Sequence, residues 1–198
     1  MIRVQFNIDD IREYQRGKLP ENAFKIKTPG SVDEMLKMAS PIAAVLCAVL
    51  IATMFLKTMG SGMRVVNFMA VFGGFIIGLA LLAVHEWLHA IVYPKTAEVT
   101  IGKIKGKFVF VALASWPMGR SRFILMSLLP FVLGIVPLAV FILSPAGNTI
   151  WNGFMFGMAS MGMVSPYADV YNVISVLRHT KKNDKVMFYE DDLYRISE

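Results

Sequence analysis

Four stretches of this 198-residue sequence carry almost no charged side chains, and they limit the folds open to it more than any other feature. Each is long enough to cross the roughly 30 Å hydrocarbon core of a bilayer, which takes about 20 helical residues. Charged residues make up 17% of the chain, against about 25% in a typical soluble domain. The sequence therefore predicts an all-α membrane protein with about four transmembrane helices, over residues 38–56, 65–93, 123–143 and 150–177.

A short segment between the second and third apolar stretches has a different pattern. Residues 96–115 contain two glycines and several β-branched side chains. Apolar residues alternate over part of this segment, at Val99, Ile101, Phe108 and Phe110. Alternation of this kind is typical of a strand with one buried face. We therefore expect a short membrane-associated β-hairpin between helices 2 and 3.

The basic residues gather on one side of these crossings. Residues 1–37 form a polar N-terminal segment, residues 38–177 the membrane domain and residues 178–198 a charged C-terminal tail. With four crossings, the two terminal segments and the hairpin loop hold 18 of the 20 Lys and Arg residues. Because basic residues are retained in the cytoplasm, we expect a multi-pass protein of the bacterial cytoplasmic (inner) membrane. Both termini and the hairpin would then be cytoplasmic.

The placement of the charges and the cysteine count argue against a nucleic-acid-binding protein and against a disulfide-bonded fold. A net charge of +6 could indicate a nucleic-acid partner, but the sequence has no run of five or six basic residues and no nucleic-acid-binding motif. The expected partner is therefore the lipid bilayer and not nucleic acid. The one cysteine, Cys47, cannot form a disulfide within a single chain.

The second apolar stretch contains the motif His85-Glu86-Trp87-Leu88-His89. On a helix, His85 and His89 project from one face about one turn apart, so both imidazoles can bind one metal ion. Glu86 lies where its carboxylate reaches a water on the metal rather than the metal itself. Two imidazoles and a third ligand hold Zn²⁺, which acidifies a water at its open position. The alternative is a pair of interfacial histidines that hydrogen-bond to neighbouring helices.

A third ligand is required, and Asp169 is the leading candidate. It is the only charged residue in the fourth apolar stretch. At 1.5 Å per residue it lies about 12 Å from the cytoplasmic end of its helix, at the depth of the first histidine. Pro166 should kink this helix, because proline cannot donate the helical hydrogen bond. The alternatives are that Asp169 pairs with Asn172, Tyr171 or a lysine of the hairpin, and that His179 is the ligand.

Small residues mark helix faces that can approach closely. Gly74-x-x-x-Gly78 lies in the second apolar stretch and Gly153-x-x-x-Gly157 in the fourth. Such pairs permit close packing of membrane helices, although they are also common without it. The first pair lies on the same face of an ideal helix as the two histidines, so one face would serve both packing and metal binding.

Together these features resemble the site-2 protease-like intramembrane metalloproteases and, more narrowly, the small bacterial membrane zincin peptidases related to them. The resemblance rests on the H-E-x-x-H motif in a membrane helix, the hairpin after it and an Asp preceded by a Pro, and it covers about residues 19–177. It implies His85, His89 and Asp169 as zinc ligands and Glu86 as general base. It also suggests that the hairpin presents an unwound substrate as an added strand.

The chain departs from the usual pattern of that family near the third ligand. Typical members have Asn before the Pro and Gly directly after the Asp, whereas here Ser165 precedes Pro166 and Val170 follows Asp169. We assign a polar role near the site to Asn172. It would orient a ligand or donate a hydrogen bond to the developing oxyanion.

The combined expectation is a zinc-dependent membrane peptidase that hydrolyses a peptide bond near the cytoplasmic face. Its partners would be the bilayer and a membrane-protein or peptide substrate, and self-association into a homo-oligomer stays open. Two other hypotheses remain. One is a non-enzymatic membrane protein that binds metal in a closed four-ligand site for structure or sensing. The other is a transporter subunit that relays protons or metal through His85, Glu86 and Asp169.

Overall fold

The computed structural model describes the chain apart from residues 27, 28, 30, 108 and 198, so Phe108 of the expected hairpin lies outside the described residues. The chain divides into two compact units. The first, called the sheet unit here, comprises Met1–Ala39, Glu86–Leu129 and Ala168–Glu198. The second, the helical unit, comprises Ser40–His85 and Pro130–Tyr167.

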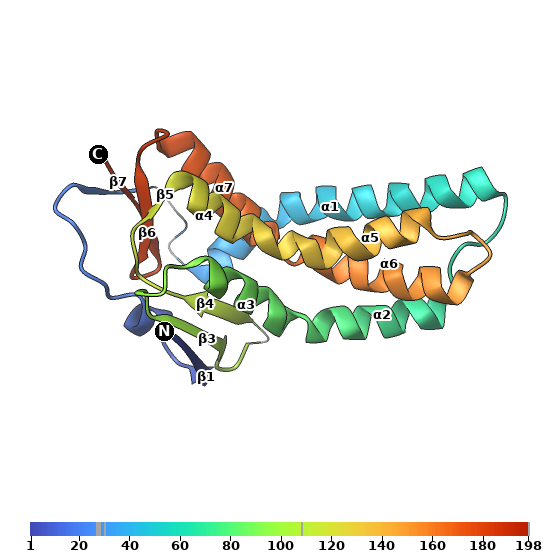
Figure 1. Ribbon diagram of the computed structural model, residues 1–198, viewed down its shortest axis with the longest axis horizontal. Helices are drawn as coiled ribbons and strands as arrows, with labels where there is room; N and C mark the ends of the chain where they lie inside the picture. The colour runs from blue at the N-terminus through green and yellow to red at the C-terminus, as the bar shows by residue number, and fades with distance from the viewer. Residues whose placement is uncertain (27–28, 30, 108, 198) are drawn as a thin grey trace. The chain divides into compact units, whose positions relative to one another are not determined.

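Apolar helices that run beside one another form the helical unit (Figure 1). It contains most of α1 (Val32–Ser61) and all of α2 (Phe68–Ala80), α5 (Val132–Leu143) and α6 (Thr149–Val164). Asn67 begins α2, because its side-chain oxygen accepts hydrogen bonds from the backbone N–H groups of Met69 and Ala70 at 3.0 and 3.1 Å. The core of the unit is apolar and includes Leu50, Phe141 and Phe156.

Glycines allow α2 and α6 to approach closely. A Cβ atom at Gly74 would collide with the backbone of Phe154, and a Cβ atom at Gly157 would collide with the backbone of Val71. Gly78, the other member of the first pair, also faces α6. Gly153, the other member of the second pair, faces the start of α2 and the residue before it. Both pairs therefore lie on the α2–α6 contact, and only a residue without a side chain fits there.

The first sheet of the sheet unit has three strands in the order β1 (Ile2–Ile8), β3 (Val99–Ile104) and β4 (Phe110–Leu113). Strands β3 and β4 pair antiparallel, as expected for the hairpin, and β1 pairs parallel to β3. The expected hairpin is thus present, but as part of a larger sheet. Sequence pattern alone did not indicate β1, because its partner lies about a hundred residues further along the chain.

The second sheet has four strands in the order β2 (Ala23–Lys25), β7 (Asp192–Ile196), β6 (Lys185–Tyr189) and β5 (Met118–Gly119). The charged C-terminal residues therefore include a hairpin, and its apolar residues Val186 and Leu193 are buried in the core of the unit. The protein is mostly helical with two small sheets, so the all-α expectation was incomplete.

Three helical runs among the described residues are long and apolar enough to cross a membrane: Asp33–Ser61, Phe68–Val92 and Arg120–Leu143. The second run joins α2 to α3 (Leu82–Val92), and the third joins α4 (Arg120–Leu128) to α5 through the short 3₁₀ helix η2 (Leu129–Phe131). A second 3₁₀ helix, η1 (Ile11–Tyr14), follows β1.

The fourth expected crossing is divided in two. Helix α6 ends at Val164 and α7 (Tyr167–His179) begins three residues later, on the other side of Ser165 and Pro166. Proline has no backbone N–H to donate, so the break at Pro166 has the physical cause expected from the sequence. A total of about four crossings stays a prediction.

Candidate metal centre

Helix α3 places His85 and His89 one turn apart. The helix starts directly after the α2 segment and ends at Val92, two residues before Pro94. Both histidine side chains are buried, and the four-residue spacing puts them on one face. The boundary between the two units passes between His85 and Glu86, inside this continuous helix.

The backbone fixes the orientation of the His89 ring. Its Nδ1 atom lies 2.8 Å from the carbonyl oxygen of Met126. A carbonyl oxygen can only accept, so Nδ1 carries the proton and donates it. In the neutral ring the lone pair is then on Nε2, the atom that faces Asp169. This is the usual way in which a metal-binding histidine is held in the correct tautomer.

Nε2 of His89 lies 3.5 Å from Oδ1 of Asp169. A charge-assisted N–H···O hydrogen bond is shorter, at about 2.7–2.9 Å. Two ligand atoms about 2.0–2.1 Å from one tetrahedral zinc ion are separated by about 3.3–3.4 Å. The observed separation therefore suits two ligands of one ion better than a direct hydrogen bond.

The His85 ring has a side-chain neighbour at its Nδ1 atom. Nδ1 of His85 lies 3.5 Å from Oγ of Ser165, the residue that follows the last turn of α6. A hydroxyl can both donate and accept, and where it accepts a hydrogen bond from Nδ1 the lone pair of His85 is on Nε2. The histidine pair is thus supported by a backbone carbonyl in one case and by a serine hydroxyl in the other.

Asp169 lies in the first turn of α7 and is half-buried. Three of the alternative partners considered from the sequence are engaged elsewhere. The hydroxyl of Tyr171 lies 3.9 Å from the sulfur of Met38, and the hairpin residues Lys105 and Lys107 pair with Asp9 and Asp33.

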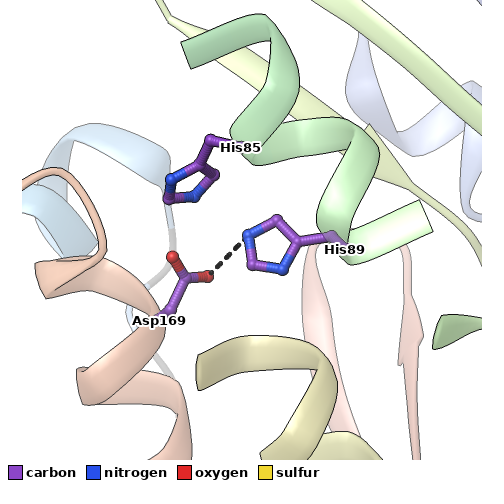
Figure 2. A group of neighbouring side chains, drawn as sticks. All are labelled: His85, His89 and Asp169. Atoms are coloured by element: carbon purple, nitrogen blue, oxygen red, sulfur yellow. Dashed lines mark ion pairs between the residues drawn. The ribbon is translucent and has the colours of Figure 1, made fainter. Parts of the chain in front are cut away.

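One ligand atom from each of His85, His89 and Asp169 lies within 4.8 Å of the others. Figure 2 shows the two rings of α3 and the carboxylate of α7 directed towards a common point. Two imidazole nitrogens and one carboxylate oxygen are a typical ligand set for a catalytic zinc ion. In the described part of the chain no fourth His, Cys, Asp or Glu joins this group, so the donor set fits a three-ligand site better than a closed one.

The other site residues named from the sequence have different positions. Glu86 follows the first histidine on α3 and is buried. Asn172 lies one turn beyond Asp169 on α7 and is half-buried, and its role stays a prediction. His179, the alternative ligand, is exposed and its Nδ1 lies 2.7 Å from the carbonyl oxygen of Ser175 in the same helix. It is not a member of the group.

A narrow hollow in the helical unit adjoins His85. Its lining is mainly apolar and includes Leu81, Leu133 and Met158, with Gly78, Gly162 and Ser165. Gly78 and Gly162 allow close helix packing at this point, because a Cβ atom at either position would collide with the neighbouring helix. One edge of the site is therefore bordered by apolar side chains and one hydroxyl.

Two groups beside the histidines were not identified as site groups from the sequence. Ser165 was noted only as a departure from the usual Asn. A polar residue directly before Pro166 was the signal in the sequence that could have identified it as a site group. The carbonyl of Met126 has no signal in the sequence, since any residue has a backbone carbonyl and only the tertiary structure brings this one to His89.

The fold and the site together define a mostly helical protein with helices suited to a membrane and with two histidines and an aspartate that can hold one metal ion. The chain belongs to the family described as "Putative zincin peptidase", whose sequence profile matches residues 78–184, more than half of the 198 residues. The matched segment contains all three residues of the group. Neither the curated proteins nor the solved structures include a match to the chain. Membership of this family implies zinc as the metal and peptidase chemistry.

Proposed function

We propose that the protein is a membrane-embedded zinc peptidase that hydrolyses a peptide bond near the cytoplasmic face. The observation that carries this proposal is the meeting of His85, His89 and Asp169, with ligand atoms within 4.8 Å of one another. Two of the three lie in a run, Phe68–Val92, that is apolar and long enough to cross a membrane. Ionisable groups in such a helix are costly and usually serve a function.

The ligand residues have separate tasks in this proposal. His85 and His89 present their Nε2 lone pairs, and the groups at their Nδ1 atoms keep the rings from rotating. Asp169 supplies a negative charge that offsets part of the charge of the ion. When bound, zinc would polarise the scissile carbonyl and lower the pKa of water.

Glu86 is the proposed general base. It accepts the proton that water loses as the water oxygen bonds to the carbonyl carbon of the substrate. It then delivers this proton to the leaving nitrogen as the C–N bond breaks, so the reaction consumes one water and yields a carboxylic acid and an amine, which become a carboxylate and an ammonium group when the acid proton passes to the amine. Burial of Glu86 keeps the carboxylate away from bulk water, where it would exchange the proton.

The substrate would be a segment of a membrane protein or a peptide. Strand β4 forms one edge of its sheet and can accept an extended backbone as an added strand. An extended backbone is what a peptidase requires, because a helical amide is enclosed by its own hydrogen bonds. The basic residues of both terminal segments and of the β3 to α4 region support a cytoplasmic location for this edge and for both termini.

Glu86→Gln is the experiment that tests the proposed function. The variant should keep about one zinc per chain and lose cleavage of a membrane-protein substrate in vesicles, because the amide cannot accept a proton. Glu98→Gln is the matched control, since Glu98 is exposed and pairs with Arg3 on the sheet. Cleavage by the Glu86→Gln variant at the rate of the unmodified protein would overturn the mechanism.

A further inference from the structure

Strand β1 has an apolar face that the protein itself leaves uncovered. Its sequence alternates apolar and polar residues, which predicts one buried face. Yet Ile2, Val4 and Phe6 are 43%, 65% and 82% exposed. Alternate residues of a strand share a face, and the pairing with β3 is regular from Ile2 to Gln5, so Ile2 and Val4 lie on one face. Phe6 follows them at the register irregularity between Gln5 and Ile8. The three exposed apolar residues Ile2, Val4 and Phe6 are called the β1 face here.

This level of exposure matches that of side chains in the candidate membrane spans. On α2, Met69 is 77% exposed and Phe72 is 62% exposed. Exposed apolar side chains on a span are expected, because lipid covers them. The β1 face is as apolar and as exposed, but it lies on a strand.

Ion pairing places the first sheet next to the start of a membrane helix. The Nζ atom of Lys107, in the turn between β3 and β4, lies 2.6 Å from Oδ1 of Asp33 in the first turn of α1. The run Asp33–Ser61 has 29 residues, which at 1.5 Å per residue is about 43 Å. The hydrocarbon core with both headgroup regions is about 40–45 Å thick. A run of this length that crosses the bilayer would place Asp33, and with it the turn, at the level of the lipid headgroups.

Strand pairing joins β1 to the segment that follows a second candidate span. Strand β3 begins at Val99, seven residues after the end of a second candidate span at Val92. Strand β1 pairs with β3 in register from Ile2 opposite Val99 to Gln5 opposite Gly102. A Cβ atom at Gly102 would collide with the backbone of Gln5, so the two strands are in close contact.

We propose that the β1 face is a lipid-contacting surface that lies in the headgroup region of the bilayer. Aliphatic and aromatic side chains gain free energy there through burial from water, while Arg3 and Gln5 on the other face stay hydrated. The bilayer is the occupant because the sheet is attached to the ends of two candidate spans. The contact depends on the insertion of the chain in a membrane and not on the metal chemistry.

Site-directed labelling of the full chain tests this proposal. Cys47→Ser removes the one native thiol, and single cysteines then replace Val4, Phe6, Arg3 or Gln5 in turn. Each variant carries a thiol-reactive fluorophore and is reconstituted in vesicles of phosphatidylcholine and phosphatidylglycerol. A nitroxide on the lipid should quench the labels at positions 4 and 6 with loss of their fluorescence, and aqueous iodide should quench those at 3 and 5.

Other results would overturn the proposal in distinguishable ways. Iodide quenching at all four positions would show that the β1 face is in water. Protection at positions 4 and 6 from both quenchers would show that protein covers it, as in an association of two copies. A label at Met69→Cys on α2 is the positive control, and its failure to respond to the lipid nitroxide would refute membrane insertion itself. The zinc content of the same samples reports separately on the proposed function.

Discussion

Oδ1 of Asp169 on α7 lies 3.5 Å from Nε2 of His89 on α3, with the other ring nitrogen of His89 held by the backbone carbonyl of Met126. The carboxylate is thus directed to the nitrogen that carries the lone pair. This relationship supports Asp169 as the third ligand of the proposed zinc site and leads to the first prediction.

Asp169→Ala and His89→Ala should each lose bound zinc, because two remaining ligands hold the ion far more weakly than three. Elemental analysis of protein purified in detergent would measure this, against about one zinc per chain in the unmodified protein. His179→Ala is the control and should retain the metal, since that ring is exposed and bonded within its own helix. Retention of zinc by Asp169→Ala would exclude the carboxylate as a ligand.

Ser165→Ala should weaken zinc binding about tenfold, because groups that orient a ligand histidine typically contribute tenfold or more to metal affinity. Titration with a competing chelator would measure the dissociation constant. Ser165→Thr should restore the affinity, as threonine keeps the hydroxyl. Ser160→Ala is the matched control: its hydroxyl lies 2.8 Å from the carbonyl oxygen of Phe156 within α6 and is not beside a histidine. Equal affinities in all four proteins would contradict a role for Ser165.

Gly74→Ala should destabilise the protein by about 1–3 kcal/mol, the usual cost of overpacking a close contact. The added methyl group would meet the backbone of Phe154, which cannot move aside as a flexible side chain can. Gly73→Ala, one residue earlier on α2, is the control, because a Cβ there has no atom within 4 Å. Thermal unfolding in detergent would compare them, and equal melting temperatures would contradict the close α2–α6 packing.

Lys57→Met should destabilise the protein by about 1–3 kcal/mol, because it removes a donor from partly buried carbonyl oxygens. Nζ of Lys57 donates to the carbonyl oxygens of Phe141 and Ser144 at the C-terminal end of α5. It also lies 3.3 Å from Oδ1 of the fully buried Asn152. Helix ends require such donors, since their last carbonyls have no partner within the helix.

The same unfolding measurement would test this prediction. Lys182→Met, a change of the same chemistry at an exposed position near the C-terminus, should leave the melting temperature unchanged. If the two substitutions had the same effect, the contacts of Lys57 would contribute nothing measurable to stability.

The membrane character of the chain and the helical spacing of its histidines could be predicted from the sequence. Apolar length and the four-residue separation of His85 and His89 are local properties, and a helix converts them directly into a span and a shared face. The break at Pro166 was predictable for the same reason, because proline acts on its own helix. The expectation that the two glycine pairs mark close helix packing is confirmed.

Pairings between distant segments could not be predicted in this way. Strand β1 reads as an alternating segment, but only the tertiary structure joins it to β3. The C-terminal residues carry enough charge to indicate a solvated tail, yet Val186 and Leu193 are buried in the core of the sheet unit. Short strands carry little local signal, because their stability comes from the neighbours against which they pack.

By itself the sequence determined which residues of the chain are candidates for binding a metal: two histidines one helical turn apart and, as the leading third candidate, a single carboxylate in a later apolar stretch. The tertiary structure decided that Asp169 faces His89, that Met126 supplies a carbonyl to one ring and that Ser165 lies beside the other. The physical reason is the range of the forces involved. Spacing on one helix follows from the backbone of that helix, whereas the meeting of two helices depends on side-chain packing over the whole core.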